Sequence, residues 1–129
     1  MRFQPKFFRC PACGQVISVL EDAGVTLTCC GQPMDKLVPN TTDAAQEKHV
    51  PVVTRSGDKV TVAIGAAPHP MLPEHFIEWI YLFQENGGQR RILTPGGAPE
   101  ATFCVEFGQP LEVYAYCNLH SLWKTAVEA

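Results

Sequence analysis

The first 36 residues carry four cysteines in two close groups, Cys10-x-x-Cys13 and the adjacent pair Cys29–Cys30. Short strand-like runs, "KFFRC", "QVISVL" and "TLTC", alternate there with Pro and Gly turns. A unit of fewer than about 40 residues rarely buries enough apolar surface to fold without a metal or a partner. The cysteine cluster therefore constrains how the start of the chain can fold.

A metal site accounts for these four cysteines better than disulfides do. A Cys-x-x-Cys turn places two thiolates on one side of an ion, and four thiolates in a tetrahedron suit iron or zinc. A disulfide between Cys29 and Cys30 would be strained, since neighbouring Cα atoms lie about 3.8 Å apart whereas disulfides prefer about 5.5–6 Å. The adjacent pair resembles desulforedoxin, a small iron–tetrathiolate protein. That resemblance favours iron, and the residues alone leave zinc open.

The bulk properties of the 129-residue chain limit its location and its partners. No apolar run approaches the ~18 residues of a membrane span, and no apolar segment of a signal peptide precedes Cys10. Six cysteines without a signal peptide favour metal binding or thiol chemistry over disulfides. The net charge of −3, with no basic block, argues against nucleic acid as a partner. We therefore expect a cytoplasmic protein that binds neither nucleic acid nor a membrane.

The rest of the chain has the pattern of an all-β domain. Strand-like runs are separated by turn signals such as "SGD", "ENGGQ" and "GQP", and in one run Val60, Val62 and Ile64 alternate with less apolar residues. The predicted strands lie at 49–55, 59–65, 75–83, 90–94, 101–107 and 111–116. The predicted organisation is a desulforedoxin-like domain at 1–36, a linker at 37–45 and an immunoglobulin-like antiparallel β-sandwich at 46–129.

All four histidines of the chain fall at predicted strand edges or in loops: His49, His69, His75 and His120. A single histidine is more often an ordinary core or surface residue. Four of them together with Cys117, at positions where a rigid sandwich presents functional groups, indicate a mononuclear metal site. Imidazole suits several first-row metals, and a thiolate adds soft, electron-rich character. Five such ligands on iron would leave one octahedral position open for a small molecule.

Two other interpretations use some of the same residues. Blue copper sites combine two His and one Cys with a weak axial Met, for which Met71 is available. Cys117 and His120 could also be a nucleophile and its base, although no oxyanion motif is evident. In the metal interpretation, the backbone N–H groups of Leu119 and His120 are placed to donate to the Cys117 sulfur.

The sixth cysteine is predicted to be a thiol that binds no metal. In "ATFCVEF" Cys104 shares strand parity with Thr102 and Glu106, opposite Phe103, Val105 and Phe107. It therefore should not face the main core. Trp79 and Trp123 flank the histidine motifs, and packing is their expected role.

Three segments, "EKHVP", "HPMLPEHFIEWI" and "YCNLHSLWK", resemble the signature segments of superoxide reductase. With "CPACG" and "CCGQPM" in front, the whole chain resembles the desulfoferrodoxin family, the two-iron form. The resemblance implies two iron ions per chain, one of them bound by Cys10, Cys13, Cys29 and Cys30. It implies that the second has His49, His69, His75 and His120 as equatorial ligands and Cys117 as axial ligand, opposite an open site.

The same resemblance implies the reaction, the reduction of superoxide by one electron to hydrogen peroxide without release of dioxygen. It also implies rubredoxin as the electron donor. A homodimer is expected, because the first region is too small to bury its own apolar side chains.

The resemblance also implies roles for two residues beside His49. Lys48 would steer the anion and order a proton-donating water, and Glu47 would bind the ferric iron after turnover. Without the resemblance, both would be ordinary solvated residues. Ser121 stands where family members commonly have Gly.

Other functions compete with this reading. A non-catalytic, rubredoxin-like electron carrier needs no open coordination site. A structural zinc module would explain the cysteines of residues 1–36 but not four histidines with Cys117. Superoxide dismutase is the nearest enzymatic rival, and in the sequence only the family resemblance separates the two.

Overall fold

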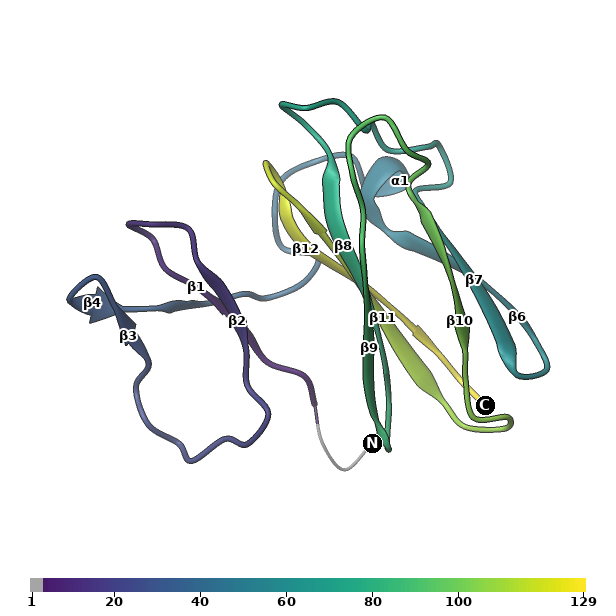
Figure 1. The fold of residues 1–129 in the computed structure, drawn as a ribbon, viewed down its shortest axis with the longest axis horizontal. Helices are drawn as coiled ribbons and strands as arrows, with labels where there is room; N and C mark the ends of the chain where they lie inside the picture. The colour runs from purple at the N-terminus through teal and green to yellow at the C-terminus, as the bar shows by residue number, and fades with distance from the viewer. Residues whose placement is uncertain (1–3) are drawn as a thin grey trace. The chain divides into compact units, whose positions relative to one another are not determined.

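The computed structural model describes residues 4–129 and divides the chain into two compact units. The first unit ends at Val38, and the second begins at Pro39 and runs to Ala129 (Figure 1). The all-β fold predicted from the sequence is confirmed, because strands provide almost all of the regular structure. Among residues 4–129 no helix has the length and apolar character that crossing a membrane requires.

The smaller unit is held by short strands and has very little core. Three strands form an antiparallel sheet in the order β2-β1-β5, and β3 pairs with β4 in a hairpin. Of residues 4–38 only Phe7 and Cys10 are buried, whereas Leu20 and Val25 are exposed. A metal at the cysteines would therefore supply stability that the apolar side chains do not. The strands are β1 Phe7–Arg9, β2 Val16–Ser18, β3 Thr28–Cys29, β4 Gln32–Pro33 and β5 Asp35–Lys36.

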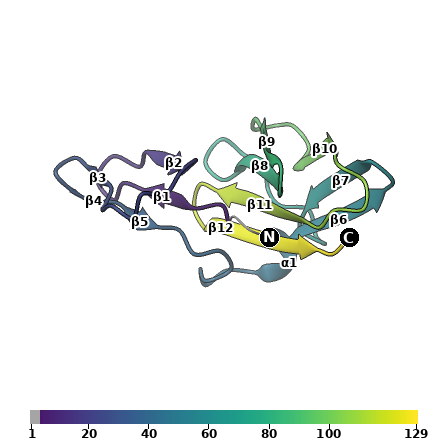
Figure 2. The same ribbon diagram turned by 90° about the horizontal axis from the view of Figure 1, so that it is seen from below.

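The larger unit, residues 39–129, consists of two antiparallel sheets with a shared core (Figures 1 and 2). The three-stranded sheet has the order β10-β7-β6, and the four-stranded sheet has the order β12-β11-β8-β9. The bounds are β6 Pro51–Ser56, β7 Lys59–Ile64, β8 Ile77–Gln84, β9 Gly87–Ile92, β10 Glu100–Cys104, β11 Leu111–Cys117 and β12 Ser121–Val127.

The core between these sheets follows from the alternation seen in the sequence. Val60, Val62 and Ile64 of β7 are fully buried, because alternate side chains of a strand point to one face. They pack with side chains of β8 and β10 and with β11, which is buried along its whole length. The ends of β7, β8 and β11 are therefore held in place by a rigid core. The other core residues are Ile77, Ile80, Leu82, Phe103, Val105, Leu111, Val113, Ala115 and Cys117.

Several details differ from the sequence-based expectations. His49 was expected to open a strand, but it ends the short helix α1 (Gln46–His49), and β6 begins only at Pro51. Strand β12 was not predicted, and β10 ends at Cys104 rather than at 107. Phe107 was expected on the core side and is 78% exposed, because the chain leaves the sheet after Cys104. Cys104 is exposed and faces away from the core, as predicted.

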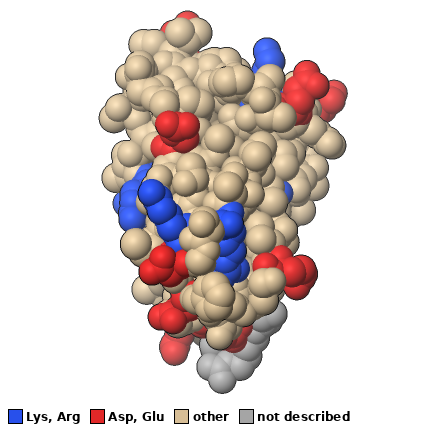
Figure 3. Space-filling model, turned by 90° about the vertical axis from the view of Figure 1, so that its right-hand side faces the viewer, with Lys and Arg blue, Asp and Glu red and all other residues tan. Residues whose placement is uncertain are grey.

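Charged side chains of both signs share the surface of the molecule. On the face shown in Figure 3, Lys and Arg side chains gather near the middle and Asp and Glu side chains flank them. The chain as a whole carries 10 basic and 13 acidic residues. The basic side chains near the middle of this face are therefore bordered by opposite charge.

A tight hairpin joins β11 to β12 and places Ser121 in an unusual backbone conformation. Cys117 pairs with Ser121 across the hairpin, and Ser121 has φ +64°. This left-handed region is costly for a residue with a Cβ and open to Gly. Ser121 thus adopts the conformation for which Gly is suited, so the chain closes this turn at a cost in backbone strain.

Replacing Ser121 with Gly is expected to stabilise the protein. The Ser121→Gly change removes left-handed strain worth about 1 kcal/mol, less the added freedom of Gly in the unfolded chain. The midpoint of thermal unfolding should rise by up to about 4 °C. The matched control is Ser56→Gly at the end of β6, where φ is not positive; it should lower the midpoint. A lowered midpoint for both variants would contradict the strain assigned to Ser121.

Candidate metal centres

The four cysteines of the smaller unit come together at two turns. Cys10 and Cys13 flank a turn in which Gly14 N–H donates to the Cys10 carbonyl at 2.9 Å. The β3–β4 hairpin brings Cys29 and Cys30 to the same place. The sulfur–sulfur distances are 3.7 Å from Cys13 to Cys29 and 3.9 Å from Cys29 to Cys30, too long for disulfide bonds. All four sulfurs lie within 4.8 Å of one another, so they can hold one metal ion.

The backbone of Cys30 explains how two adjacent cysteines serve one site. Successive side chains of an extended strand point to opposite faces. Cys30 has φ +53°, in the left-handed region, and therefore leaves the extended conformation of β3, which ends at Cys29. The two sulfurs consequently lie on the same side of the hairpin, where their separation is close to that of ligands on one tetrahedral ion.

The pKa values of these thiols indicate that the four do not ionise easily together. The backbone N–H of Cys13 points to the Cys10 sulfur at 3.5 Å and, as the largest cause, lowers the pKa of Cys10 to about 6. The pKa of Cys29 is raised to about 12, chiefly by its hydrogen bond to Cys10 and then by Cys13. A thiol that must ionise beside an existing thiolate resists doing so, unless a cation is bound between them.

A second cluster lies at one end of the sandwich in the larger unit. Helix α1 carries His49, the loop between β7 and β8 carries His69 and His75, and the end of β11 carries Cys117 (Figure 1). One donor atom from each of these four residues lies within 4.8 Å of the others. His120, in the turn after β11, completes the predicted set. Its Nδ1 is 3.2 Å from His49 Nε2 and 3.8 Å from Cys117 Sγ.

Hydrogen bonds determine which ring nitrogens face this cluster. Nδ1 of His49 lies 2.6 Å from the Ala45 carbonyl, and Nδ1 of His69 lies 2.7 Å from the Pro70 carbonyl. Because a carbonyl can only accept, each Nδ1 carries the proton and each Nε2 keeps a free lone pair. Nε2 of His69 and Nε2 of His75 are buried and have no hydrogen-bond partner. Buried nitrogens without a partner are costly, and a metal bound by their lone pairs would remove that cost.

The imidazoles are prepared to bind a cation at neutral pH. Burial is the largest cause that lowers the pKa of His49, of His75 and of His69, which falls to about 4. These rings are therefore neutral near pH 7, as metal ligation requires. Burial raises the pKa of Cys117, while the backbone N–H groups of Leu119 and His120 oppose that rise, in agreement with their predicted donation to the sulfur.

The two tryptophans near the ligands pack against aromatic rings. Trp123 is buried and stacks on the ring of His49, with centroids 4.8 Å apart and planes inclined by 28°. Its indole N–H donates to the His120 carbonyl at 3.0 Å. Trp79 stacks on Tyr116 at 5.4 Å. Trp123 therefore packs as the sequence predicted, and it supports two candidate ligands at once.

Glu47 and Lys48 lie on helix α1, and both are exposed. The pKa of His49 and of His75 is lowered chiefly by burial, then by the neighbouring histidines, and least by the charge of Lys48. The Glu47 carbonyl accepts a hydrogen bond from the Ala67 N–H at 3.0 Å, so the backbone of α1 is fixed while the carboxylate stays at the surface.

Close backbone approach beside α1 depends on a glycine. Gly65 has φ +87°, and a Cβ there would lie 2.7 Å from the Lys48 carbonyl oxygen and clash with that of Ala67. Its N–H also donates to the Val50 carbonyl at 3.2 Å. In the sequence Gly65 is the last residue of the predicted strand 59–65, and a Gly in a strand can indicate a close backbone approach. Gly65 thus joins the helix of His49 to the loop of His69.

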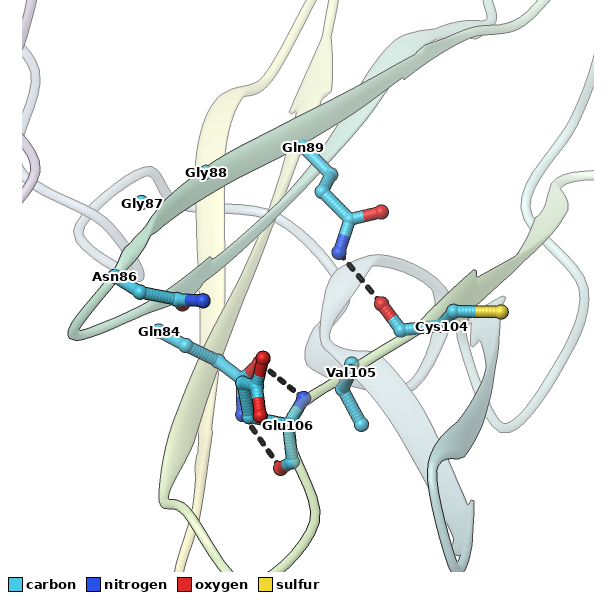
Figure 4. A pocket seen from close by; sticks show the side chains of 8 residues that line it. All are labelled: Gln84, Asn86, Gly87, Gly88, Gln89, Cys104, Val105 and Glu106. Atoms are coloured by element: carbon cyan, nitrogen blue, oxygen red, sulfur yellow. Dashed lines mark hydrogen bonds between the residues drawn. The ribbon is translucent and has the colours of Figure 1, made fainter.

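Other residues singled out in the sequence lie outside the cluster. Met71, the axial ligand of the copper interpretation, packs against the hydrophobic core. Cys104 lines a cavity of about 300 Å³ together with Gln84, Asn86 and Gln89. The Gln89 side chain donates to the Cys104 carbonyl at 2.7 Å, and the Cys104 thiol points away from the other lining residues (Figure 4). This cavity is not lined by any candidate ligand.

Comparisons with known proteins point to one family for both units of the chain. The family model described as "Desulfoferrodoxin" matches residues 41–126, and that described as "Desulfoferrodoxin, N-terminal domain" matches residues 4–37. A desulfoferrodoxin of Clostridium acetobutylicum is 50% identical over 115 residues, which cover 88% of this chain and 90% of that protein. A desulfoferrodoxin of Syntrophotalea carbinolica is 46% identical over 118 residues, covering 92% and 93%.

A solved structure shares nearly the whole fold. The crystal structure of the superoxide reductase from Treponema pallidum has a TM-score of 0.77 and 35% sequence identity, and the match covers 95% of this chain and 99% of that one. The matched family models lie in the order in which the two clusters occur, and together they span both units of the chain. The chain belongs to the desulfoferrodoxin family.

Proposed function

We propose that the chain is a superoxide reductase, which converts superoxide to hydrogen peroxide with one electron and two protons. The observation that carries the proposal is the convergence of four imidazoles and one thiol, with Nε2 of His69 and of His75 buried and unpartnered. The Treponema pallidum structure of the same fold bears the name superoxide reductase. The donor set of this chain and the name of that relative therefore support the same reaction.

Both clusters can bind a metal, and we propose iron at each. Four thiolates suit iron or zinc, and family membership favours iron at the site of Cys10, Cys13, Cys29 and Cys30. His49, His69, His75, His120 and Cys117 would hold the second ion, through imidazole nitrogens and one sulfur. When bound, this iron would supply the electron and an open coordination position for superoxide.

Cys117 would control how readily the electron leaves. A thiolate increases the electron density on its metal, and hydrogen bonds to the sulfur moderate that effect. The Cys117 sulfur is buried, and the neighbouring N–H groups of Leu119 and His120 oppose the rise of its pKa, which supports this role. The thiol therefore acts as a ligand that tunes the centre and not as a nucleophile.

Lys48 and Glu47 would act from the surface beside the centre. An exposed ammonium close to the imidazoles raises the local concentration of a small anion and speeds its arrival. It can also hold a water that delivers a proton to the reduced substrate. Glu47, on the same short helix, would occupy the open position after turnover.

The remaining proposals concern organisation and partners. We propose a desulforedoxin-like domain at 1–36, a linker at 37–45 and a catalytic domain at 46–129, in a cytoplasmic homodimer reduced by rubredoxin. A non-catalytic electron carrier is the alternative, and it gives no reason for an open coordination position or for a cation beside it. Superoxide dismutation differs in product, because it also oxidises superoxide to dioxygen.

Product analysis distinguishes these functions. Superoxide is generated by pulse radiolysis in the presence of the iron-loaded, reduced protein, and hydrogen peroxide and dioxygen are both measured. We expect one peroxide for each superoxide consumed and no dioxygen from the catalysed reaction. Dioxygen equal to half of the superoxide consumed would establish dismutation, and failure to accelerate its disappearance would leave the electron carrier.

The Lys48→Ala variant should react more slowly with superoxide. Loss of the cation should lower the second-order rate constant about threefold to tenfold at low ionic strength, and the rate should then depend less on added salt. The matched control is Lys59→Ala, which changes net charge equally at the far end of β7. An unchanged rate for Lys48→Ala at low salt, or an equal loss for Lys59→Ala, would remove Lys48 from the mechanism.

Metal affinity of the histidine–cysteine centre should rise with pH. The pKa of Cys117 is raised by burial, so its thiol must release a proton when an ion binds, whereas three of the imidazoles already carry free lone pairs. Ferrous ion titrated anaerobically, with the four-cysteine centre already filled, should bind about tenfold more tightly per unit between about pH 7 and pH 8.

Two cysteine variants complete this titration. Cys104→Ser should retain both the affinity and its pH dependence, since Cys104 is exposed and lies outside the cluster. Cys117→Ser should lose most of the affinity. An affinity that is independent of pH in the parent chain would show that Cys117 does not give up a proton to the metal.

A further inference from the structure

The four candidate histidines are not held in place in the same way. Hydrogen bonds from Nδ1 to backbone carbonyls orient the rings of His49 and His69. The indole of Trp123 donates to the backbone of His120. Within residues 4–129 no hydrogen bond holds the ring of His75, whose Nε2 is buried and unpartnered. This ring contacts the rings of His69 and His120, with centroids 4.7 and 5.2 Å apart, and its position otherwise depends on the backbone that carries it.

The backbone around His75 is held largely by one side chain from another element. Asn118 Nδ2 donates to the Glu74 carbonyl at 3.0 Å, and Asn118 Oδ1 accepts the Phe76 N–H at 3.0 Å. The Asn118 N–H also donates to the Phe76 carbonyl at 3.2 Å. One residue thus binds both chain neighbours of His75. His75 itself exchanges two hydrogen bonds with Leu72, at 3.0 and 3.1 Å, which closes the loop on the other side.

Asn118 also lies between two ligands along the chain. It follows Cys117 directly and precedes His120 by two positions. The register of β11 against β8 shifts between Tyr116 and Cys117, so regular pairing of these strands is interrupted next to the site. Hydrogen bonds from Asn118 replace the regular pairing there. They tie the turn that carries Cys117 to the loop that carries His75.

We infer that Asn118 is a positioning residue, whose side-chain amide orients the imidazole of His75 toward the metal through the backbone of Glu74 and Phe76. It binds no metal and touches no substrate. The inference rests on the proposed five-ligand centre, and it adds a residue that fixes the geometry of that centre. An Asn fits because it offers a donor and an acceptor at the same time, which neither Asp nor Ala can do.

The test compares metal binding and spectra of Asn118→Ala with the parent chain. Residues that orient a metal ligand from outside typically change affinity 10–100-fold when removed. We expect ferrous ion affinity at the histidine–cysteine centre to fall at least tenfold, and the thiolate-to-iron absorption of the oxidised centre to shift or broaden. The four-cysteine centre of the same chain is the internal reference, and its absorption and metal content should not change.

Two further variants guard against a general loss of structure. Asn86→Ala removes an exposed Asn from the β8–β9 turn at the opposite end of β8, and it should behave as the parent chain does. Asn118→Ser keeps a hydroxyl that can replace one of the two side-chain hydrogen bonds, and its loss of affinity should be smaller than that of Asn118→Ala. Affinity within twofold of the parent in both Asn118 variants would overturn the inference.

A double-variant cycle tests whether Asn118 acts through His75. In the His75→Ala background the ring to be oriented is gone, so adding Asn118→Ala should lower iron affinity by less than twofold. A full additive loss would overturn the inference and place the effect of Asn118 on Cys117 or His120. If the parent chain itself bound no iron at this centre, the proposed function would fail instead, and the two failures are therefore distinguishable.

Discussion

Buried imidazole nitrogens without hydrogen-bond partners are the costly feature around which the larger unit is organised. An unsatisfied buried polar group costs about 1–3 kcal/mol, and Nε2 of His69 and of His75 are two such groups. His49 Nε2 and His120 Nδ1 lie 3.2 Å apart, within hydrogen-bond distance of each other, so these two nitrogens are partnered. The protein can maintain this arrangement because two packed sheets form a core that, apart from Cys117, consists of residues outside the site. A bound ion then turns the same costs into ligand bonds.

The smaller unit differs from the larger one, because it has four candidate metal ligands but almost no core. Within residues 4–38 only Phe7 and Cys10 are buried, so no core fixes the chain before the metal arrives. Its four sulfurs also resist sharing ionised states, as the opposite shifts of the Cys10 and Cys29 pKa values indicate. Metal binding and folding should therefore be tightly coupled in this unit. In the larger unit the coupling between folding and metal binding should be weak, because the two packed sheets can form before a metal binds.

The sequence predicted the parts of this structure that depend on local pattern or on specific motifs. Alternation identified the buried face of β7, and the histidine and cysteine motifs identified a set of ligands that the fold brings together. Phe107 was misplaced because strand parity was extended beyond Cys104, where a side chain of β8, Gln84, binds the Glu106 backbone instead. That contact joins residues 22 positions apart and has no local signal.

Residues that support the ligands were harder to predict, for a physical reason. Gly65 and Asn118 are ordinary turn residues by composition, and their importance appears only when distant backbone segments meet them. Ser121 was visible as a departure from the family pattern, but its left-handed φ was not. A ligand is recognised by its own chemistry, whereas a supporting residue is recognised by the geometry of its partners.

The arrangement of helix α1 separates the two tasks that its residues have. Its backbone is fixed, since the Glu47 carbonyl binds Ala67 and the Lys48 carbonyl packs against Gly65. The side chains of Glu47 and Lys48 nevertheless remain exposed. His49, at the end of the same helix, is buried and held by Ala45 and Trp123. One turn of helix can therefore keep a ligand rigid while it presents two charges that are free to change partners, because the rigidity comes from carbonyl contacts and not from those side chains.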